Sequence, residues 1–213
     1  MKKSLSYLWP LTKSYDSDYS GKLEVSWING RKVLDSHNAN YSYGALEKVM
    51  DHGLAKNRAD RGAPVLVLGL GGGSVIPLLR NKYNYYSEIT AVEIDPAVIE
   101  IARKEFGIEE YGPLEIICAD AEDFVRSGTG DFGLIIVDLF LDLQVPEQFF
   151  TPAFWNNISS LLMHHGKVIF NAGIHSAHEL QVIRLLKEES LNLNFQKEEN
   201  VCGINTLLFG MRK

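Results

Sequence analysis

A glycine run and a later acidic residue are the parts of this sequence whose residue types and spacing best suit ligand binding. Residues 65–68 are four consecutive apolar residues, typical of a strand buried on both faces, and residues 69–74 read Gly-Leu-Gly-Gly-Gly-Ser. Glycines let backbone N–H groups approach a ligand, and a helix starting near Ser74 would point its N-terminal amides into the same space. Glu93 ends the next apolar run, where a parallel strand would bring its carboxylate to a ribose diol. The pattern predicts a pocket for an adenosine-containing cofactor.

Asp95 is a second acidic residue beside Glu93. It directly precedes Pro96, and an acidic residue before a proline is typical of a helix N-cap followed by the first helical residue. We therefore assign Asp95 to capping and Glu93 to the ligand. The alternative is that Glu93 itself caps the helix.

Two further acidic residues follow later apolar runs. Asp120 comes after the run 114–118, and Asp138 follows the run 133–137. Ligands of open α/β sheets bind at the carboxyl ends of the strands, so both residues are expected in the same crevice as Glu93. Asp120 could accept a hydrogen bond from an adenine amino group or cap the following helix, and both roles stay open.

Asp138 is the candidate for chemistry. The apolar residues 139–141 follow it, and Asp142 comes next. An apolar loop beside two carboxylates predicts a lid over a substrate, and an ordinary buried turn is the alternative. No Ser-His-Asp arrangement, Walker lysine or His-Glu-x-x-His spacing accompanies it, which argues against hydrolysis, phosphoryl transfer and zinc chemistry.

The elements that position these residues alternate between strands and helices. The sequence predicts strands over 65–69, 89–93, 114–118, 133–138 and 167–171. It predicts helices near 74–82, 96–106, 120–126, 151–163 and 176–190. Two final strands, 193–200 and 204–212, have no helix between them. The prediction is an α/β fold: a doubly wound, mostly parallel sheet that ends in an antiparallel strand pair.

The first part of the chain has a different pattern. Residues 22–28 alternate polar and apolar side chains, and Asn29-Gly30 separates them from the apolar residues that follow, which predicts a β-hairpin over 22–34. An amphipathic helix is predicted over 44–56. We expect an N-terminal hairpin segment, 1–43, followed by a Rossmann-like domain, 44–213.

Composition narrows the functional class. The 213 residues are 46% hydrophobic with a net charge of −6, which suits one substantial core and argues against a nucleic-acid-binding protein. Cys118 and Cys202 match no metal spacing, so no metal site is predicted. The sequence contains no signal-peptide core and no run long enough to span a bilayer, so we expect a cytoplasmic protein without membrane contact.

Four short segments together resemble a known family. They read Val-Leu-Val-Leu-Gly-Leu-Gly-Gly-Gly-Ser, Ala-Val-Glu-Ile-Asp-Pro, Cys-Ala-Asp-Ala and Ile-Ile-Val-Asp. They resemble the class I S-adenosylmethionine-dependent transferases, and among these they are most similar to the spermidine synthase group. The resemblance implies that S-adenosylmethionine or its decarboxylated form is the cofactor, and that the protein is a homodimer. The cofactor residues it implies are Gly69, Gly71, Gly72, Gly73, Ser74, Glu93, Ile94, Asp120 and Ala121.

The resemblance is weaker where the family binds its polyamine. Aminopropyltransferases carry an acidic residue after the three glycines, where this chain has Ser74. That acid would repel the carboxylate of intact S-adenosylmethionine, and Ser74 removes the repulsion. The family's Asp-Ser-Ser-Asp-Pro loop is here Asp138 to Asp142 with apolar residues between, and its polyamine-binding segment is reduced to Tyr43. The catalytic residues that the resemblance implies are Asp138, Asp142 and Tyr43.

Three functions follow from these observations. The first is a methyltransferase that uses intact S-adenosylmethionine on a small-molecule acceptor, with Asp138 orienting or deprotonating the acceptor. The second is an aminopropyltransferase in which Asp138 is the base and Asp142 and Tyr43 hold a cationic amine. The third is a binding module without turnover. A nicotinamide dehydrogenase is disfavoured because too little chain follows Asp138 for a separate catalytic domain.

Overall fold

Two sheets make up the protein. The structure is a computed structural model that describes residues 11–36, 40–42, 45–141, 144–174, 177–203 and 205–213. The smaller sheet is antiparallel and has the order β1-β2-β3-β4. Its strands are β1 (Leu11–Ser17), β2 (Gly21–Ile28), β3 (Arg31–Ser36) and β4 (Asn40–Ser42). The predicted hairpin is confirmed as β2 and β3, and β1 and β4 extend it to a sheet that the sequence did not predict.

The larger sheet has the order β10-β11-β9-β8-β5-β6-β7. Its strands are β5 (Val65–Leu68), β6 (Ile89–Glu93), β7 (Leu114–Cys118), β8 (Phe132–Val137), β9 (Leu162–Ile174), β10 (Leu193–Val201) and β11 (Asn205–Arg212). The five strands β5 to β9 pair in parallel, while β11 pairs antiparallel with both β9 and β10. The predicted doubly wound sheet with an antiparallel end is therefore confirmed.

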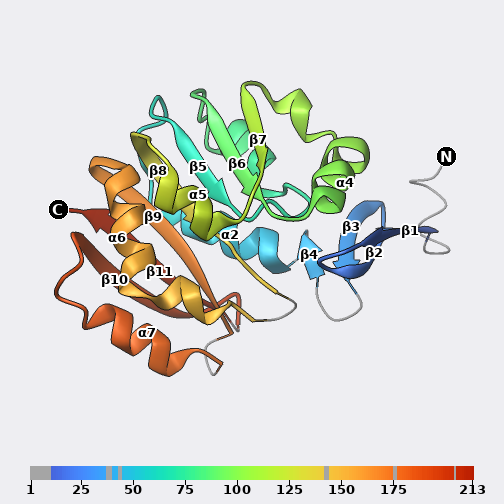
Figure 1. Cartoon of the computed structure of the whole chain (residues 1–213). Coiled ribbons are helices and arrows are strands. Elements are labelled where there is room, and N and C mark those ends of the chain that lie inside the picture. The colour runs from blue at the N-terminus through green and yellow to red at the C-terminus, as the bar shows by residue number, and fades with distance from the viewer. Residues whose placement is uncertain (1–10, 37–39, 43–44, 142–143, 175–176, 204) are drawn as a thin grey trace.

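Helices cover both faces of this larger sheet (Figure 1). They are α2 (Ala45–Lys56), α3 (Val75–Pro77), α4 (Pro96–Phe106), α5 (Ala121–Ser127), α6 (Pro152–Leu161) and α7 (Glu179–Leu186). Two short 3₁₀ helices, η2 (Ile108–Tyr111) and η3 (Glu147–Phe150), and a π-helical turn, η1 (Leu78–Lys82), complete the fold.

Two predicted helices differ from those observed. The helix predicted over 74–82 is the short α3 followed by the π turn η1, in which the Tyr83 N–H donates to the Leu78 carbonyl. The helix predicted over 176–190 ends earlier, since α7 closes at Leu186 with capping bonds from the Lys187 N–H. Helical spacing of apolar residues predicts that a segment is helical but does not fix where its hydrogen bonds stop.

Alternate residues of the central strands pack into two separate hydrophobic cores, one on each face of the larger sheet. On β5, Leu66 and Leu68 pack with side chains of α5, α6 and α7, whereas Val65 and Val67 pack with side chains of α2, α3 and α4. All four are fully buried. This two-sided burial explains why the strand reads as an unbroken apolar run rather than as an alternating one.

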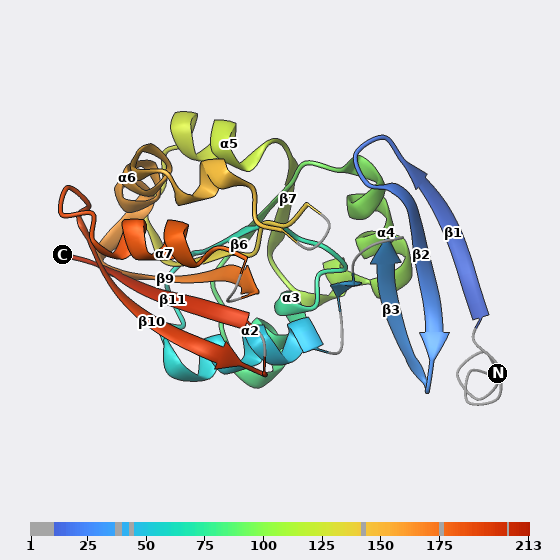
Figure 2. The same cartoon turned by 90° about the horizontal axis from the view of Figure 1, so that it is seen from below.

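The small sheet packs on α4 (Figure 2). Leu23, Val25 and Leu34 of the sheet form a buried cluster with Val98 and Ile101 of the helix. At the far end of α4, the Glu105 carboxylate accepts hydrogen bonds from Lys13, Tyr15 and Lys32. The sheet is thereby fixed to the helix that follows β6. The division at residues 43/44 remains our proposal for the domain boundary.

Candidate cofactor and acceptor site

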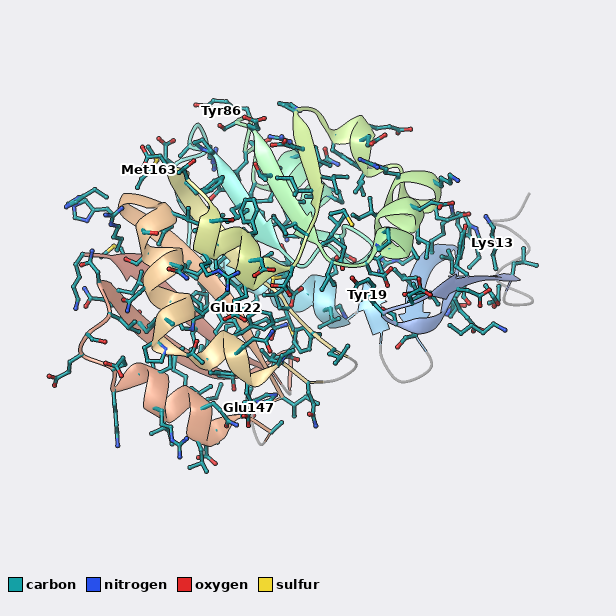
Figure 3. All side chains as sticks on the ribbon, viewed as in Figure 1. Lys13, Tyr19, Tyr86, Glu122, Glu147 and Met163 are labelled. Carbon is teal, nitrogen blue, oxygen red and sulfur yellow. The ribbon has the colours of Figure 1, made fainter. Side chains whose placement is uncertain are left out.

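The carboxyl ends of four neighbouring strands bring the candidate residues together. In the order β8-β5-β6-β7, these strands end at Val137, Leu68, Glu93 and Cys118, and Asp138, Gly69 and Ala119 directly follow β8, β5 and β7. The backbone ladder continues one residue beyond β8 and β7: the N–H of Asp138 donates to Leu68 O, at 2.9 Å, and that of Ala119 to Glu93 O, at 3.0 Å. Figure 3 places Tyr86 and Met163 at the other end of the strands, where β6 and β9 begin. The strand order reverses between β5 and β8, because β6 and β7 lie on one side of β5 and β8 and β9 on the other, and open α/β sheets bind ligands at such a point.

Gly69 makes the tightest approach in this crevice. Its φ is +87°, and a Cβ placed there would lie 2.2 Å from the carbonyl oxygen of Asp138. Gly73 is similarly constrained, with φ +77° and a Cβ position 2.6 Å from Ile108 Cγ2. Only glycine fits either position, so the predicted turn rests on a steric requirement at both ends of the run.

Glu93 is bound into the glycine loop by the main chain. Its Oε2 accepts from the N–H groups of Leu70, at 3.0 Å, and Gly71, at 3.3 Å, and its Oε1 accepts from Asp95 N–H at 3.1 Å. Burial raises the pKa of Glu93, and the three N–H donors oppose that rise. The carboxylate and the loop therefore form one preorganised unit.

Asp95 performs the capping role predicted for it. Its Oδ1 accepts from the Ala97 N–H at 2.9 Å, and Pro96 is the first residue of α4. Its Oδ2 accepts from the hydroxyls of Ser17 at the end of β1, at 2.5 Å, and Ser20 in the β1–β2 turn, at 2.9 Å. Ile94, between Glu93 and Asp95, is exposed. This leaves Glu93 free of any capping role and Ile94 open to a ligand.

Asp120 is a helix cap. Its Oδ1 accepts from the N–H groups of Glu122, at 2.8 Å, and Asp123, at 3.0 Å, at the start of α5, and the next residue, Ala121, is buried. The capping alternative is thus observed. A contact of Asp120 with adenine remains a prediction for its second oxygen.

Asp138 is held by a chain of amide side chains. Asn171 Nδ2 donates to Asp138 Oδ1 at 2.9 Å. Asn171 Oδ1 accepts in turn from Asn205 Nδ2, at 2.9 Å, and from the Gly173 N–H, at 3.2 Å, so its amide can point only one way. Burial raises the pKa of Asp138 to about 6, against the opposing effect of the Asn171 hydrogen bond.

Sequence reasoning missed Asn171 and Asn205. Asn171 is fully buried within β9, and Asn205 is 5% exposed at the start of β11. A buried amide needs hydrogen-bond partners, so an asparagine inside the apolar run Val-Ile-Phe-Asn-Ala was an available signal. Its partner could not be found in this way, because it lies on another strand.

The segment after Asp138 is apolar, as its sequence predicts. Leu139 and Phe140 pack partly buried against the core beneath α6 and α7, and Leu141 is 59% exposed. The Val145 N–H, which follows the segment, donates to Nε2 of the buried His178 at 3.2 Å. The other two predicted catalytic residues, Asp142 and Tyr43, lie outside the described residues. The lid role of this segment stays a prediction.

Two features are absent from the described residues. No helix among them is long and apolar enough to cross a membrane. Within the same residues, no group of three or more His, Cys, Asp or Glu side chains could hold a metal ion.

Curated relatives of the chain fall into two transferase groups. The "eEF1A lysine and N-terminal methyltransferase" of Mus musculus is 30% identical over 148 residues, covering 59% of this chain and 21% of that protein. The "Polyamine aminopropyltransferase" of Chromobacterium violaceum is 34% identical over 108 residues, covering 50% of this chain and 41% of that protein. The chain therefore spans about a fifth and two fifths of the lengths of these relatives.

Solved structures show the same two groups. A spermidine synthase in complex with the transition-state analogue AdoDATO superposes with a TM-score of 0.73 at 18% identity, covering 94% of this chain and 73% of that one. Human methyltransferase-like protein 13 in complex with SAH gives a TM-score of 0.62 at 26% identity, with coverages of 80% and 83%. The similarity to the spermidine synthase establishes the fold. The second similarity shows that a methyltransferase-like protein shares this fold.

A family model covers most of the chain. The spermine/spermidine synthase domain matches residues 46–212, from the second residue of α2 to the last residue of β11. It includes every described residue of the strand-end crevice. The chain belongs to the spermine/spermidine synthase domain family.

Proposed function

We propose that this protein is an S-adenosylmethionine-dependent methyltransferase that acts on a small-molecule acceptor. The observation that carries the proposal is Ser74, a neutral residue at the position where aminopropyltransferases have an acid. Ser74 is only partly buried, at the N-cap of α3, and its hydroxyl makes no capping bond. An uncharged side chain at this position accepts a cofactor that carries a carboxylate.

The residues present fit such a cofactor. The turn at Gly69 leaves room only for a backbone without a Cβ, and the Glu93 carboxylate stands beside it at the end of β6, where a ribose diol could be bound. Gly71, Gly72, Gly73 and Ser74 would border its methionine end, and Ile94, Asp120 and Ala121 its adenine. When bound, S-adenosylmethionine would supply a sulfonium methyl group, whose carbon an acceptor lone pair attacks while the C–S bond breaks and S-adenosylhomocysteine leaves.

Asp138 is the residue that we propose to handle the proton. With a pKa of about 6 it is ionised at neutral pH, yet close enough to the operating pH to take a proton from an acceptor nucleophile. Asn171 fixes Oδ1 by its hydrogen bond and so orients the carboxylate. Leu139 and Phe140, which follow directly, would limit access of water to the reacting atoms.

Aminopropyl transfer is the second candidate, and the family membership itself favours it. Among the curated relatives, the proteins of Chromobacterium violaceum and Vibrio vulnificus are named polyamine aminopropyltransferases. In this reaction Asp138 would take a proton from the attacking amine, and Asp142 and Tyr43 would hold the cationic acceptor. The carboxylate at position 138 serves either reaction, so Ser74 is what separates them.

Calorimetric titration with S-adenosylmethionine and with its decarboxylated form tests the choice. We expect the intact cofactor to bind more tightly to the wild-type protein. Ser74→Asp should weaken that binding at least about tenfold, because it places like charges in a partly buried site. Ser74→Asn is the matched control, because asparagine has nearly the size of aspartate but carries no charge. This variant should bind the intact cofactor nearly as well as the wild type does.

Tighter binding of the decarboxylated cofactor by the wild type would overturn the proposal. Aminopropyl products from putrescine, cadaverine or spermidine would then assign the second candidate. Binding of the intact cofactor without turnover of any amine, hydroxyl or carboxyl acceptor would instead favour a non-catalytic binding module.

We also propose that the protein is a cytoplasmic homodimer. Cys118 and Cys202 are exposed free thiols, which suits a reducing compartment. β1 is an edge strand of the small sheet, and such an edge can pair with another chain. Light scattering during size-exclusion chromatography measures the mass directly, and a monomeric mass at micromolar concentration would contradict the dimer.

A further inference from the structure

A hollow beside α2 is lined by cationic side chains from three segments of the chain. Its volume is about 510 Å³, and none of its residues belongs to the strand-end crevice. Lys48, Asp51, His52 and Ala55 come from α2, Arg58 and Arg61 from the loop before β5, Lys82 and Tyr83 from the end of η1, and Cys202 from the β10–β11 turn. Figure 2 shows α3, which leads into η1, beside α2.

The acid that lines this hollow is already engaged. Asp51 Oδ2 accepts from Lys82 Nζ at 2.6 Å, and Asp51 Oδ1 accepts from the Tyr83 hydroxyl at 2.7 Å. These hydrogen bonds lower the pKa of Asp51 despite the opposing effect of burial. Asp51 therefore neutralises Lys82, and His52, which also lines the hollow, has the Glu198 carboxylate as its partner at 3.0 Å.

Three other cations of the hollow have no partner among the described residues. Within the described residues, the side chains of Lys48, Arg58 and Arg61 make no hydrogen bond or ion pair. Elsewhere in the same residues most cationic side chains have an ion-pair or hydrogen-bond partner. Lys13 and Lys32 form ion pairs with Glu105, and the Arg80 guanidinium donates hydrogen bonds to four backbone carbonyls. Unpaired positive charge thus collects at one hollow of a protein whose net charge is −6.

We propose that this hollow, which we call the α2 groove, binds a small polyphosphate anion, either free or as part of a nucleotide. Two guanidinium groups offer forked donors that match phosphate oxygens, and Lys48 adds a mobile point charge. The volume lies in the range of small-molecule pockets, roughly 300–1,000 Å³. The site is independent of the proposed methyl transfer, because it shares no residue with the cofactor crevice.

Titration calorimetry of the full chain with inorganic tripolyphosphate and with ATP at low ionic strength tests the proposal. We expect both to bind, with weaker binding as salt is added. With an excess of S-adenosylmethionine to fill the strand-end crevice, equal affinities would assign the polyphosphate alone, and tighter binding of ATP would assign a nucleotide. An excess of S-adenosylmethionine should leave the tripolyphosphate affinity unchanged, because the two sites are separate.

A pair of charge-matched variants locates the binding. Arg58→Gln/Arg61→Gln should weaken tripolyphosphate binding at least about tenfold, since charge-assisted hydrogen bonds are lost. Arg184→Gln/Lys187→Gln removes the same net charge at the end of α7 and should change the affinity by less than about twofold. Thermal unfolding of both variants checks that each is folded.

Three results would overturn the proposal. The first is an Arg58→Gln/Arg61→Gln protein that binds tripolyphosphate as wild type does. The second is loss of tripolyphosphate binding when S-adenosylmethionine is added. The third is tighter binding of a polyglutamate peptide or a single-stranded RNA oligomer than of either small anion, which would assign the α2 groove to a macromolecule.

Discussion

Glu93 and Asp138 are carboxylates at the ends of the two strands that flank β5, yet they are held in different ways. Glu93 accepts three hydrogen bonds from backbone N–H groups. Asp138, within the described part of the chain, accepts one, from the side chain of Asn171. Burial raises the pKa of both. The Glu93 half of the crevice, where we propose the cofactor, is thus built from main chain, and the Asp138 half, where we propose the acceptor, from side chains.

The two halves of the crevice therefore differ in how strongly they depend on individual side chains. Backbone donors are present whatever side chains the loop carries, so the Glu93 half depends on loop shape and on the glycines that permit it. The Asp138 half depends on Asn171 and Asn205, and a single substitution at either can retune it. The variants below test this contrast.

Gly69→Ala should have the largest effect. Its Cβ would meet the Asp138 carbonyl oxygen at 2.2 Å with φ at +87°, so the loop must move away from both halves of the crevice. We expect cofactor binding to be lost and the free energy of unfolding to fall by about 3 kcal/mol or more. Calorimetry and urea unfolding measure the two effects.

Gly21→Ala is the matched control for this clash. Gly21 also has a positive φ, +67°, but a Cβ there meets nothing within 4 Å. It should cost only about 1 kcal/mol and leave cofactor binding intact. Equal losses in the two variants would mean that strain, and not the contact with Asp138, governs the loop.

Asp138→Asn should slow turnover strongly without weakening cofactor binding. Removing a general base lowers rates by about 10²–10⁴-fold. Wild-type turnover should rise with pH through about 6, as Asp138 ionises, and the variant should lack this step. Rates measured across this pH range with an identified acceptor provide the check, and a variant that keeps the step would assign it to another group.

The same variant has a stability signature. Because burial favours the protonated carboxyl, the wild-type free energy of unfolding should fall as the pH rises from the ordinary carboxyl pKa to about 6. Asp138→Asn removes the ionisable group, so that fall should be absent. Above pH 6 the variant should be at least as stable as wild type in thermal unfolding.

Glu93→Gln should weaken cofactor binding with a smaller change in rate at saturation. The amide keeps the size of the side chain but loses the charge that the Leu70 and Gly71 N–H groups stabilise. Loss of one charge-assisted hydrogen bond corresponds to roughly tenfold in affinity. An unchanged cofactor affinity would show that Glu93 only shapes the loop.

Asn171→Leu should have the smallest effect, a shift of the pH profile. The Asn171 hydrogen bond lowers the pKa of Asp138, so its removal should raise that pKa and move the rise in turnover to higher pH. Asn205→Ala, one step further along the chain of amides, should shift it less in the same direction. If neither variant moves the profile, the amides have a packing role only.

The same contrast explains how far the sequence could be interpreted. Buried runs, the glycine run and the Asp95-Pro96 cap predict their structures because the governing interactions are local. Asn171 and Asn205 lie on different strands, and their meeting depends on β9 and β11 pairing antiparallel. β1 was missed since Leu-Thr-Lys-Ser-Tyr-Asp-Ser has little apolar alternation and most of its residues are exposed.

The α2 groove could not be predicted from the sequence either. Its cations are spread from Lys48 to Lys82, with no run that would stand out along the chain. They converge because the side chains of α2 and η1 meet, as the Tyr83 hydroxyl on Asp51 shows. The negative net charge of the sequence therefore gives no sign of the local cluster of positive charge, which forms only in the folded protein.

The two oxygens of Asp95 have an evolutionary consequence. One caps α4, which follows β6, and the other accepts from Ser17 at the end of β1 and Ser20 in the β1–β2 turn. A lineage that lost or exchanged the small sheet would leave the second oxygen without its hydroxyl partners, two residues from Glu93. We expect Ser17, Ser20 and Asp95 to be inherited or replaced together.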